Sequence, residues 1–144
     1  DLPGFLDYRS HIKAHSIFNT PPVFSIYVVL LVTRWLLNEI GGLENMAALN
    51  TQKSELLYHA LDQSDGFYRG HAAIADRSQM NVSFNLPDKA LEQRFLQETA
   101  AAGFSGLGGH RSIGGMRASL YNGLTLSAVE ELLAFMAEFR KTNG

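Results

Sequence analysis

A strongly apolar run near the start of the chain constrains its fold more than any other feature. The run, VFSIYVVLLVTRWLL, covers residues 23–37, with a Pro-Pro pair before it and a Gly-Gly pair after it. Proline is tolerated in a first helical turn and glycine ends helices, so the sequence predicts one helix that ends near Glu39. The run is shorter than a membrane span and contains Arg34. This favours a helix of a soluble protein, buried in a core or at an interface, and no membrane partner is expected.

The size and charge of the chain limit the classes of protein to which it can belong. Its 144 residues are 46% apolar, which suffices for the core of one domain. The net charge of −2 gives no electrostatic basis for binding nucleic acid or an anionic membrane, so any anion site has to be local. Cysteine is absent and no basic-then-apolar leader precedes the first helix. We therefore expect a cytoplasmic protein without disulfides.

The remaining patterns predict a small sheet with helices. Apolar periodicity and turn residues predict helices at about 43–62, 89–102 and 125–141 and strands at about 80–86, 104–107 and 116–121. Residues 1–20 carry few periodic signals and are expected to form an irregular lead-in. The order is two helices, a strand, a helix, two strands and a helix. It predicts an α/β (α+β) fold with a short mixed or antiparallel sheet and helices packed on one face.

The stretch GGHRSIGGMR, residues 108–117, concentrates groups that can bind anions. Its four glycines allow the backbone to come close to a small molecule. Arg111 and Arg117 present planar donor forks that fit carboxylate or phosphate, and His110 adds another donor. Two separated arginines would suit a ligand with two anionic groups. The alternative is a hairpin whose glycines form the turns and whose arginines lie in solvent.

A second stretch, FNTPP at residues 18–22, stands where the first long helix is expected to begin. A helix N-terminus exposes unpaired N–H groups and the positive end of the helix dipole, which attract phosphate. Asn19 and Thr20 could hydrogen-bond a phosphate there. The alternative is that they only cap the helix, with the two prolines in its first turn.

Other candidates for chemistry are weaker. His11 and His15 have the i, i+4 spacing of a zinc pair, but no glutamate lies between them and no third ligand is evident, so no metal site is predicted. The four lysines stand on expected polar helix faces, near a helix end or in the lead-in, so none is predicted to be a nucleophilic amine: Lys13, Lys53, Lys89 and Lys141.

Several motifs, in order, resemble one enzyme family. The segments SIFNTPPVFSIYVVLLVTRWL, QKSELLYHALDQSDGFYRG, RSQMNVSF and GGHRSIGGMRASLYNG are similar to the C-terminal part of phosphoserine aminotransferases, and together they cover almost the whole chain. The resemblance implies the aspartate-aminotransferase fold class, fold-type I, with pyridoxal 5'-phosphate as cofactor. It also implies that residues 1–20 lead in from a large domain outside this chain and that 21–144 form the small C-terminal domain.

The resemblance further implies an activity. Members transfer an amino group between L-glutamate and 3-phosphohydroxypyruvate, giving O-phospho-L-serine and 2-oxoglutarate for serine biosynthesis, and in many bacteria they also serve pyridoxine biosynthesis. They act as homodimers. The alternative, from the residues alone, is a non-catalytic module for small-anion binding or dimerisation.

Site roles carry over by the same resemblance. His110 and Arg111 would face the phosphate of the substrate or the side-chain carboxylate of glutamate, and Arg117 would bind the α-carboxylate. Asn19 and Thr20 would hydrogen-bond the cofactor phosphate in the site of the neighbouring subunit. The Schiff-base lysine of the family precedes the part seen here, so no catalytic residue is assigned to this chain and the chain alone is expected to be inactive.

Overall fold

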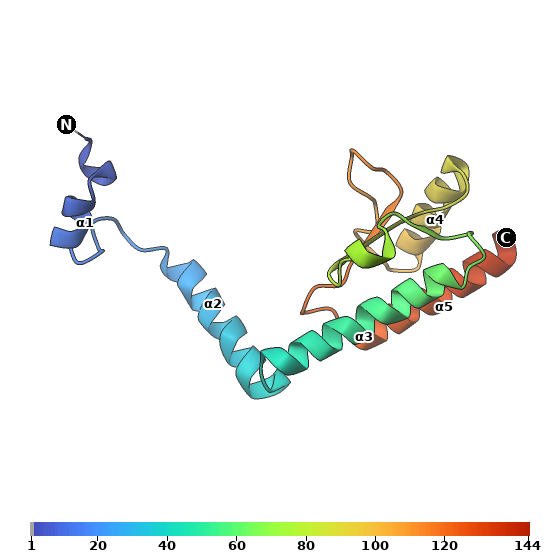
Figure 1. Ribbon diagram of the computed structural model, residues 1–144, viewed down its shortest axis with the longest axis horizontal. Coiled ribbons are helices and arrows are strands. Elements are labelled where there is room, and N and C mark those ends of the chain that lie inside the picture. The colour runs from blue at the N-terminus through green and yellow to red at the C-terminus, as the bar shows by residue number, and fades with distance from the viewer. Residues whose placement is uncertain (1) are drawn as a thin grey trace. The chain divides into compact units, whose positions relative to one another are not determined.

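The computed structural model describes residues 2–144, which form helices and one small sheet (Figure 1). The elements follow in the order α1 Tyr8–Lys13, α2 Val23–Trp35, α3 Leu43–Asp62, β1 Arg69–Gly70, β2 Asn81–Asn85, α4 Lys89–Ala101, β3 Met116–Ser119 and α5 Leu126–Asn143. Short 3₁₀ turns lie at Gly4–Leu6 and Ile74–Asp76, and a π-helical segment at Leu36–Ile40. The chain divides into two compact units, one up to Gly42 and one of Leu43–Gly144.

The lead-in is more ordered than its sequence suggested. Within the expected irregular segment, a six-residue helix, α1, begins after Asp7, whose carboxylate accepts a hydrogen bond from the Arg9 backbone N–H at 3.0 Å. A helix of this length completes less than two turns, so it leaves no periodic apolar pattern to detect. His15 and Ser16, with positive φ angles of 48° and 64°, turn the backbone after α1.

Helix α2 begins later than predicted. Its N-cap is Pro22, which makes no side-chain cap hydrogen bond, and the first helical bond runs from Ile26 N to the Pro22 carbonyl oxygen at 3.1 Å. The alternative that Asn19 and Thr20 cap the helix is therefore wrong. A residue before proline is pushed out of the α region, so neither Thr20 nor the first proline can adopt helical angles easily.

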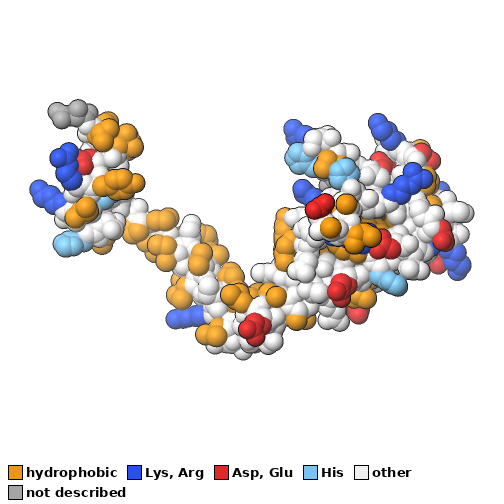
Figure 2. Space-filling model, in the orientation of Figure 1, with side chains coloured by type: hydrophobic (Ala, Val, Ile, Leu, Met, Phe, Trp, Pro, Cys, Tyr) orange, Lys and Arg blue, Asp and Glu red, His pale blue; other side chains and the backbone are white. Residues whose placement is uncertain are grey.

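The surface of α2 is apolar and exposed within this chain. None of the residues of α2 is buried, and Phe24 is 78% exposed. Figure 2 shows hydrophobic side chains along the visible face of this helix. Together with the π-helical segment it spans Val23–Ile40, with a mean hydropathy of 1.6 over 18 residues, which is long and apolar enough to cross a membrane. A core helix of a soluble protein and a signal sequence pass the same test, so one such helix is weak evidence for a membrane.

The Leu43–Gly144 unit is built on a three-stranded antiparallel sheet in the order β1-β2-β3. In β2 and β3 alternate residues are buried, as expected for strands with one covered face. The cross-strand pairs Val82–Ala118 and Phe84–Met116 lie on that covered face. The other face carries half-buried polar residues, including Ser83 paired with Arg117. The prediction of a small sheet with helices on one face is confirmed.

Three helices supply the rest of the core. Helices α3 and α5 run side by side (Figure 1), and α4 contributes Phe95, which is fully buried. The Phe95 ring meets Phe84 of β2 edge-on at 6.1 Å between centroids, and Phe139 of α5 at 5.1 Å. Edge-to-face aromatic pairs at this spacing stabilise beyond their buried area. The core therefore joins the sheet to α4 and α5 through one aromatic cluster.

One expected strand is absent from the described residues. At 104–107 the chain is irregular, because Gly103 and Gly106 have φ angles of 94° and 74°, in the left-handed region that strands do not use. An isolated bridge joins Gly108 to Met116 just after it. The order from α2 onward is therefore two helices, two strands, a helix, a strand and a helix, and the predicted order was wrong at this point.

The prediction that Lys53 lies on a polar helix face was wrong. Its side chain is buried in α3, with 1% exposure, and its ammonium donates to the carbonyl oxygens of Leu120, Tyr121 and Leu124 at 3.0–3.1 Å. Burial lowers the pKa of Lys53 below its ordinary value. Three hydrogen bonds use all three donors of the ammonium, so Lys53 holds the β3–α5 connection against α3 and has no free N–H for other chemistry.

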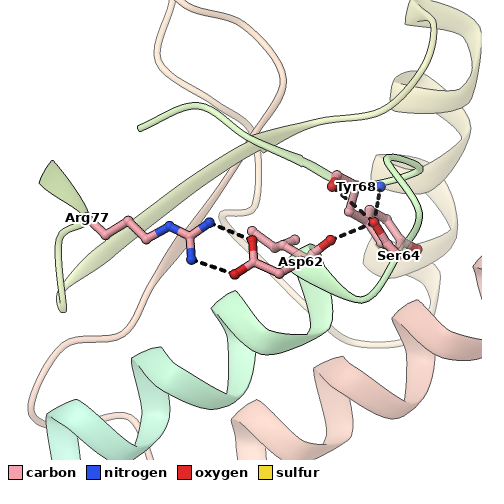
Figure 3. Close-up of polar contacts among 5 residues, drawn as sticks. Asp62, Ser64, Tyr68 and Arg77 are labelled. Carbon is pink, nitrogen blue, oxygen red and sulfur yellow. Dashed lines mark hydrogen bonds and ion pairs between the residues drawn. The ribbon is translucent and has the colours of Figure 1, made fainter. Parts of the chain in front are cut away.

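An ion pair joins the end of α3 to the segment before β2. Figure 3 shows Arg77 facing Asp62, with two hydrogen bonds of 2.7 and 2.6 Å between the guanidinium and the carboxylate. The guanidinium carbon also lies 4.4 Å from the centroid of the Tyr58 ring. In the same view Ser64 accepts from the Tyr68 backbone N–H at 2.8 Å. The ion pair thus ties the segment before β2 to α3, and the Ser64–Tyr68 contact fixes the turn between α3 and β1.

We expect Asp62 to titrate below its ordinary pKa of 3.8, because the hydrogen bond from Arg77 favours the charged carboxylate. The pair then stabilises the fold above pH 3.8, and this contribution is lost as the pH falls through the lowered native pKa. Since the Asp62 side chain is 46% exposed, solvent screening limits the contribution to about 0.5 kcal/mol.

An NMR titration of the Asp62 side-chain carbon measures this directly. Arg77→Ala should return the midpoint toward 3.8. Arg94→Ala, which removes a guanidinium from a separate pair with Glu98, should leave it unchanged. A wild-type midpoint at or above the ordinary value would contradict the assignment.

Candidate functional site

The glycine-rich stretch forms a hairpin at the start of β3. The Arg117 backbone N–H donates to the Leu107 carbonyl oxygen at 2.8 Å, and the Gly109 N–H donates to the Gly115 carbonyl oxygen at 2.9 Å. At the tip, both Ile113 N and Gly114 N donate to the His110 carbonyl oxygen, at 3.0 and 2.8 Å. The stretch therefore forms a hairpin, as in the alternative interpretation. Whether it binds a ligand depends on where the side chains of Arg111 and Arg117 lie.

Two glycines are required by close backbone approach. A Cβ on Gly109 would overlap the carbonyl oxygen of Gly114, on the opposite arm of the hairpin. A Cβ on Gly115 would overlap the side-chain amide of Asn85 and lie 2.7 Å from the carbonyl oxygen of Phe84, and Gly115 also has a φ of 63°. The hairpin is thus closed and seated on the end of β2 in a way that no other residue allows.

His110 stands exposed at the tip with one ring nitrogen already engaged. Its Nδ1 lies 2.7 Å from the Ser112 hydroxyl and accepts a hydrogen bond from the Ser112 backbone N–H at 3.3 Å. Since Nδ1 accepts, hydrogen bonding assigns the proton of the neutral ring to Nε2. His110 can therefore donate from Nε2 to an anion without disturbing the loop.

Arg111 and Arg117 differ from the other arginines of this unit. Four arginines of Leu43–Gly144 have a carbonyl or carboxylate partner for the guanidinium, namely Arg69, Arg77, Arg94 and Arg140. Within residues 2–144 the guanidinium groups of Arg111 and Arg117 make no hydrogen bond or ion pair. In Arg117 this includes a buried Nε, and a buried donor without a partner is unfavourable unless a ligand or water pairs with it.

The two arginines stand in different surroundings. Arg117 is half-buried on β3, on the sheet face that the helices leave uncovered. Arg111 is exposed and borders a hollow of about 400 Å³ at the start of α4, together with Lys89 and two carboxylates, Asp88 and Glu92. One cation is therefore fixed by the sheet and the other is presented by a loop.

Asn19 and Thr20 belong to the other compact unit, just before α2. Both are exposed, and within the described part of the chain neither side chain makes a hydrogen bond. The preceding residue, Phe18, packs edge-on against the His11 ring at 5.2 Å between centroids, and His11 Nε2 lies 2.9 Å from the Phe5 carbonyl oxygen. Since they do not cap α2, their amide and hydroxyl groups remain available to a ligand.

The structure offers little for other kinds of site. Among residues 2–144, no group of three or more His, Cys, Asp or Glu side chains could hold a metal ion. A separate hollow of about 460 Å³ between the α4–β3 connection, β3 and α5 is lined by small and apolar residues and by Glu131, and none of the predicted site residues lines it. The arginine and histidine side chains of the hairpin therefore form the candidate site of this unit.

Known proteins match almost the entire chain. The family model described as aminotransferase class-V matches residues 3–132. The phosphoserine aminotransferase of Herpetosiphon aurantiacus is 51% identical over 144 residues, which are all of this chain and 40% of that protein. The Bacillus subtilis phosphoserine aminotransferase is 48% identical over 143 residues, 99% of this chain and 40% of that protein. The chain thus spans about 40% of the length of these relatives.

Solved structures agree with the sequence matches. Phosphoserine aminotransferase from Bacillus circulans subsp. alkalophilus superposes with a TM-score of 0.91 at 45% identity, covering 99% of this chain and 39% of that one. A PLP-bound phosphoserine aminotransferase from Trichomonas vaginalis superposes with a TM-score of 0.82 at 34% identity, covering 94% of this chain and 39% of that one. Fold and sequence therefore indicate the same group of proteins.

Proposed function

The chain belongs to the aminotransferase class-V family, and we propose that it is the C-terminal part of a phosphoserine aminotransferase. The whole enzyme would transfer an amino group between L-glutamate and 3-phosphohydroxypyruvate, giving O-phospho-L-serine and 2-oxoglutarate. It would act as a cytoplasmic homodimer in serine biosynthesis and, in bacteria, pyridoxine biosynthesis. Residues 1–20 would lead in from the large domain and 21–144 would form the small domain. The observation that carries the proposal is the match of nearly the full chain to these enzymes at about 50% identity.

The unpaired arginines support this substrate class. Phosphoserine carries a phosphate and a carboxylate, and glutamate carries two carboxylates. A site for both needs one cation for the shared α-carboxylate and another for the distal anion. Arg117, whose buried Nε has no partner among residues 2–144, suits the α-carboxylate. His110 and Arg111, on the exposed tip, suit the phosphate or the distal carboxylate.

Pyridoxal 5'-phosphate, when bound, would supply the electron sink for proton removal at Cα of the substrate. Within this chain, Asn19 and Thr20 have the donors to hold its phosphate, as members of the family do in the neighbouring subunit. The resemblance places the lysine that this chemistry needs before this chain. The buried lysine, Lys53, donates all three of its N–H groups to carbonyl oxygens. This chain's part in the reaction would be to bind and orient anions.

We expect the 144-residue chain alone to transfer no amino group, whereas the full-length protein converts phosphoserine and 2-oxoglutarate into glutamate. A coupled assay of glutamate formation on both proteins, with the cofactor added, measures this. Sequencing the reading frame upstream provides the control, since it should contain the cofactor lysine. Turnover by the chain alone would contradict the division of roles proposed here.

A non-catalytic module for anion binding or dimerisation is the alternative. It predicts that no lysine-bearing half precedes this chain and that the full protein has no transferase activity. Because the relatives extend well beyond the matched segment, this alternative is not favoured.

A further inference from the structure

The hairpin that carries His110 and Arg111 rests directly on the end of β2. Phe84 pairs with Met116 across the sheet, so one step further along the two strands brings Asn85 to Gly115. A Cβ at Gly115 would overlap the Asn85 side-chain amide nitrogen. The amide of Asn85 is therefore in direct contact with the hairpin backbone, at the base of the arm that leads to Arg111.

The Asn85 amide is itself held by α4. Its Nδ2 donates to Glu92 Oε1 at 3.0 Å, and the same carboxylate oxygen accepts from the Leu86 backbone N–H at 3.4 Å. Glu92 lies in the first turn of α4, where the helix dipole stabilises a negative charge. The Glu92 carboxylate thus fixes the orientation of the Asn85 amide, against which the hairpin backbone packs.

The strand β2 also sets the position of the second cation. Ser83 of β2 pairs with Arg117, while Asn85, two residues along the same strand face, supports the hairpin. The distance between Arg117 and the hairpin tip that carries Arg111 therefore depends on strand β2 and on the rotamer of the Asn85 side chain. For a ligand with two anions, this separation determines which ligand fits.

We propose that Asn85 and Glu92 are positioning residues of the anion site. Glu92 holds the Asn85 amide, which seats Gly115 and thereby places His110 and Arg111 at the distance from Arg117 that a phosphate-bearing substrate requires. The inference rests on the proposed function. The hollow beside Arg111 is lined by both residues, so the support lies next to the cation that it places.

The test uses the full-length enzyme with Glu92→Ala, Glu92→Gln and the control Glu98→Ala. Glu98 is on the same helix, pairs with Arg94 in an exposed position and has no contact with Asn85. We expect Glu92→Ala to raise KM for phosphoserine by about tenfold or more while kcat changes less than about twofold, since small displacements of a positioning group have effects of this size. Glu92→Gln keeps an oxygen that can accept from Asn85 and should recover most of the loss.

Two further measurements separate positioning from loss of structure. Hydrogen exchange of the Gly109 amide, which donates to Gly115, should accelerate in Glu92→Ala and not in Glu98→Ala. KM for glutamate should rise less than KM for phosphoserine. Glu92→Ala kinetics equal to those of Glu98→Ala, or equal losses in Ala and Gln variants, would overturn the inference. Wild-type enzyme without activity on phosphoserine would instead refute the proposed function.

Discussion

Arg117→Ala in the full-length enzyme is expected to lower kcat/KM for phosphoserine and for glutamate alike, by roughly a hundredfold to a thousandfold, or about 3–4 kcal/mol. The reason is that both substrates share the α-carboxylate, which Arg117 is proposed to bind. The guanidinium is half-buried and its Nε has no partner in the described part of the chain. Removal of the guanidinium leaves the α-carboxylate of the substrate desolvated and without a counter-ion, which is strongly unfavourable.

Steady-state kinetics with each amino acid measure this effect, and the absorbance of the bound cofactor checks that the variant remains loaded. Arg117→Lys keeps the charge but loses the planar fork, so we expect partial recovery. Arg111→Ala should weaken phosphoserine at least as much as glutamate. Arg94→Ala, which removes an arginine already paired with Glu98, is the matched control. If Arg117→Ala behaved like this control, the assignment of the α-carboxylate site would be wrong.

Lys53→Met is expected to lower the free energy of unfolding by about 1–3 kcal/mol. Methionine fits the space of the lysine stem but donates no hydrogen bond, so the carbonyl oxygens of Leu120, Tyr121 and Leu124 each lose a partner. The hydrogen bond to Leu120 is buried and the other two are part-buried, and a carbonyl oxygen left without a donor away from water is destabilising by about 1 kcal/mol or more. The connection from β3 into α5 should loosen first, because these carbonyls belong to it.

Urea unfolding followed by far-UV circular dichroism measures the change, and hydrogen exchange at 120–128 localises it. Lys89→Met removes an exposed lysine and should alter stability by less than about 0.5 kcal/mol. A Lys53→Met variant as stable as Lys89→Met would show that the carbonyl oxygens find water instead, and the role assigned to Lys53 would fail.

Lys53 also shows what the sequence could have predicted. The bounds of α3, Leu43–Asp62, match the expected helix, because apolar periodicity over five turns is a strong pattern. Its buried residues follow one stripe at spacings of three and four, Met46, Asn50, Lys53, Ser54, Leu57 and Leu61. Lys53 lies on that stripe, but its polarity placed it on the surface in the prediction. The position of Lys53 in the helix indicates a buried side chain, whereas its residue type indicates an exposed one.

The residues of the candidate site could be identified from the sequence, but their arrangement in space could not. The sequence indicates His110, Arg111 and Arg117 as anion-binding groups. The structure places them on one hairpin and its strand, where neither guanidinium group has a partner among residues 2–144. Their roles stay predictions until they are measured. The support from Asn85 and Glu92 could not be read from the sequence, because it depends on strand register and on a close approach that only Gly115 permits.

Helix α2 carries a consequence for the life of the chain in a cell. While it is uncovered, an apolar helix of this kind is a surface that chaperones bind and that quality-control proteases recognise. We expect the cellular half-life of the whole protein to depend on how quickly another surface covers α2, and to respond little to mutations that strengthen the core of Leu43–Gly144.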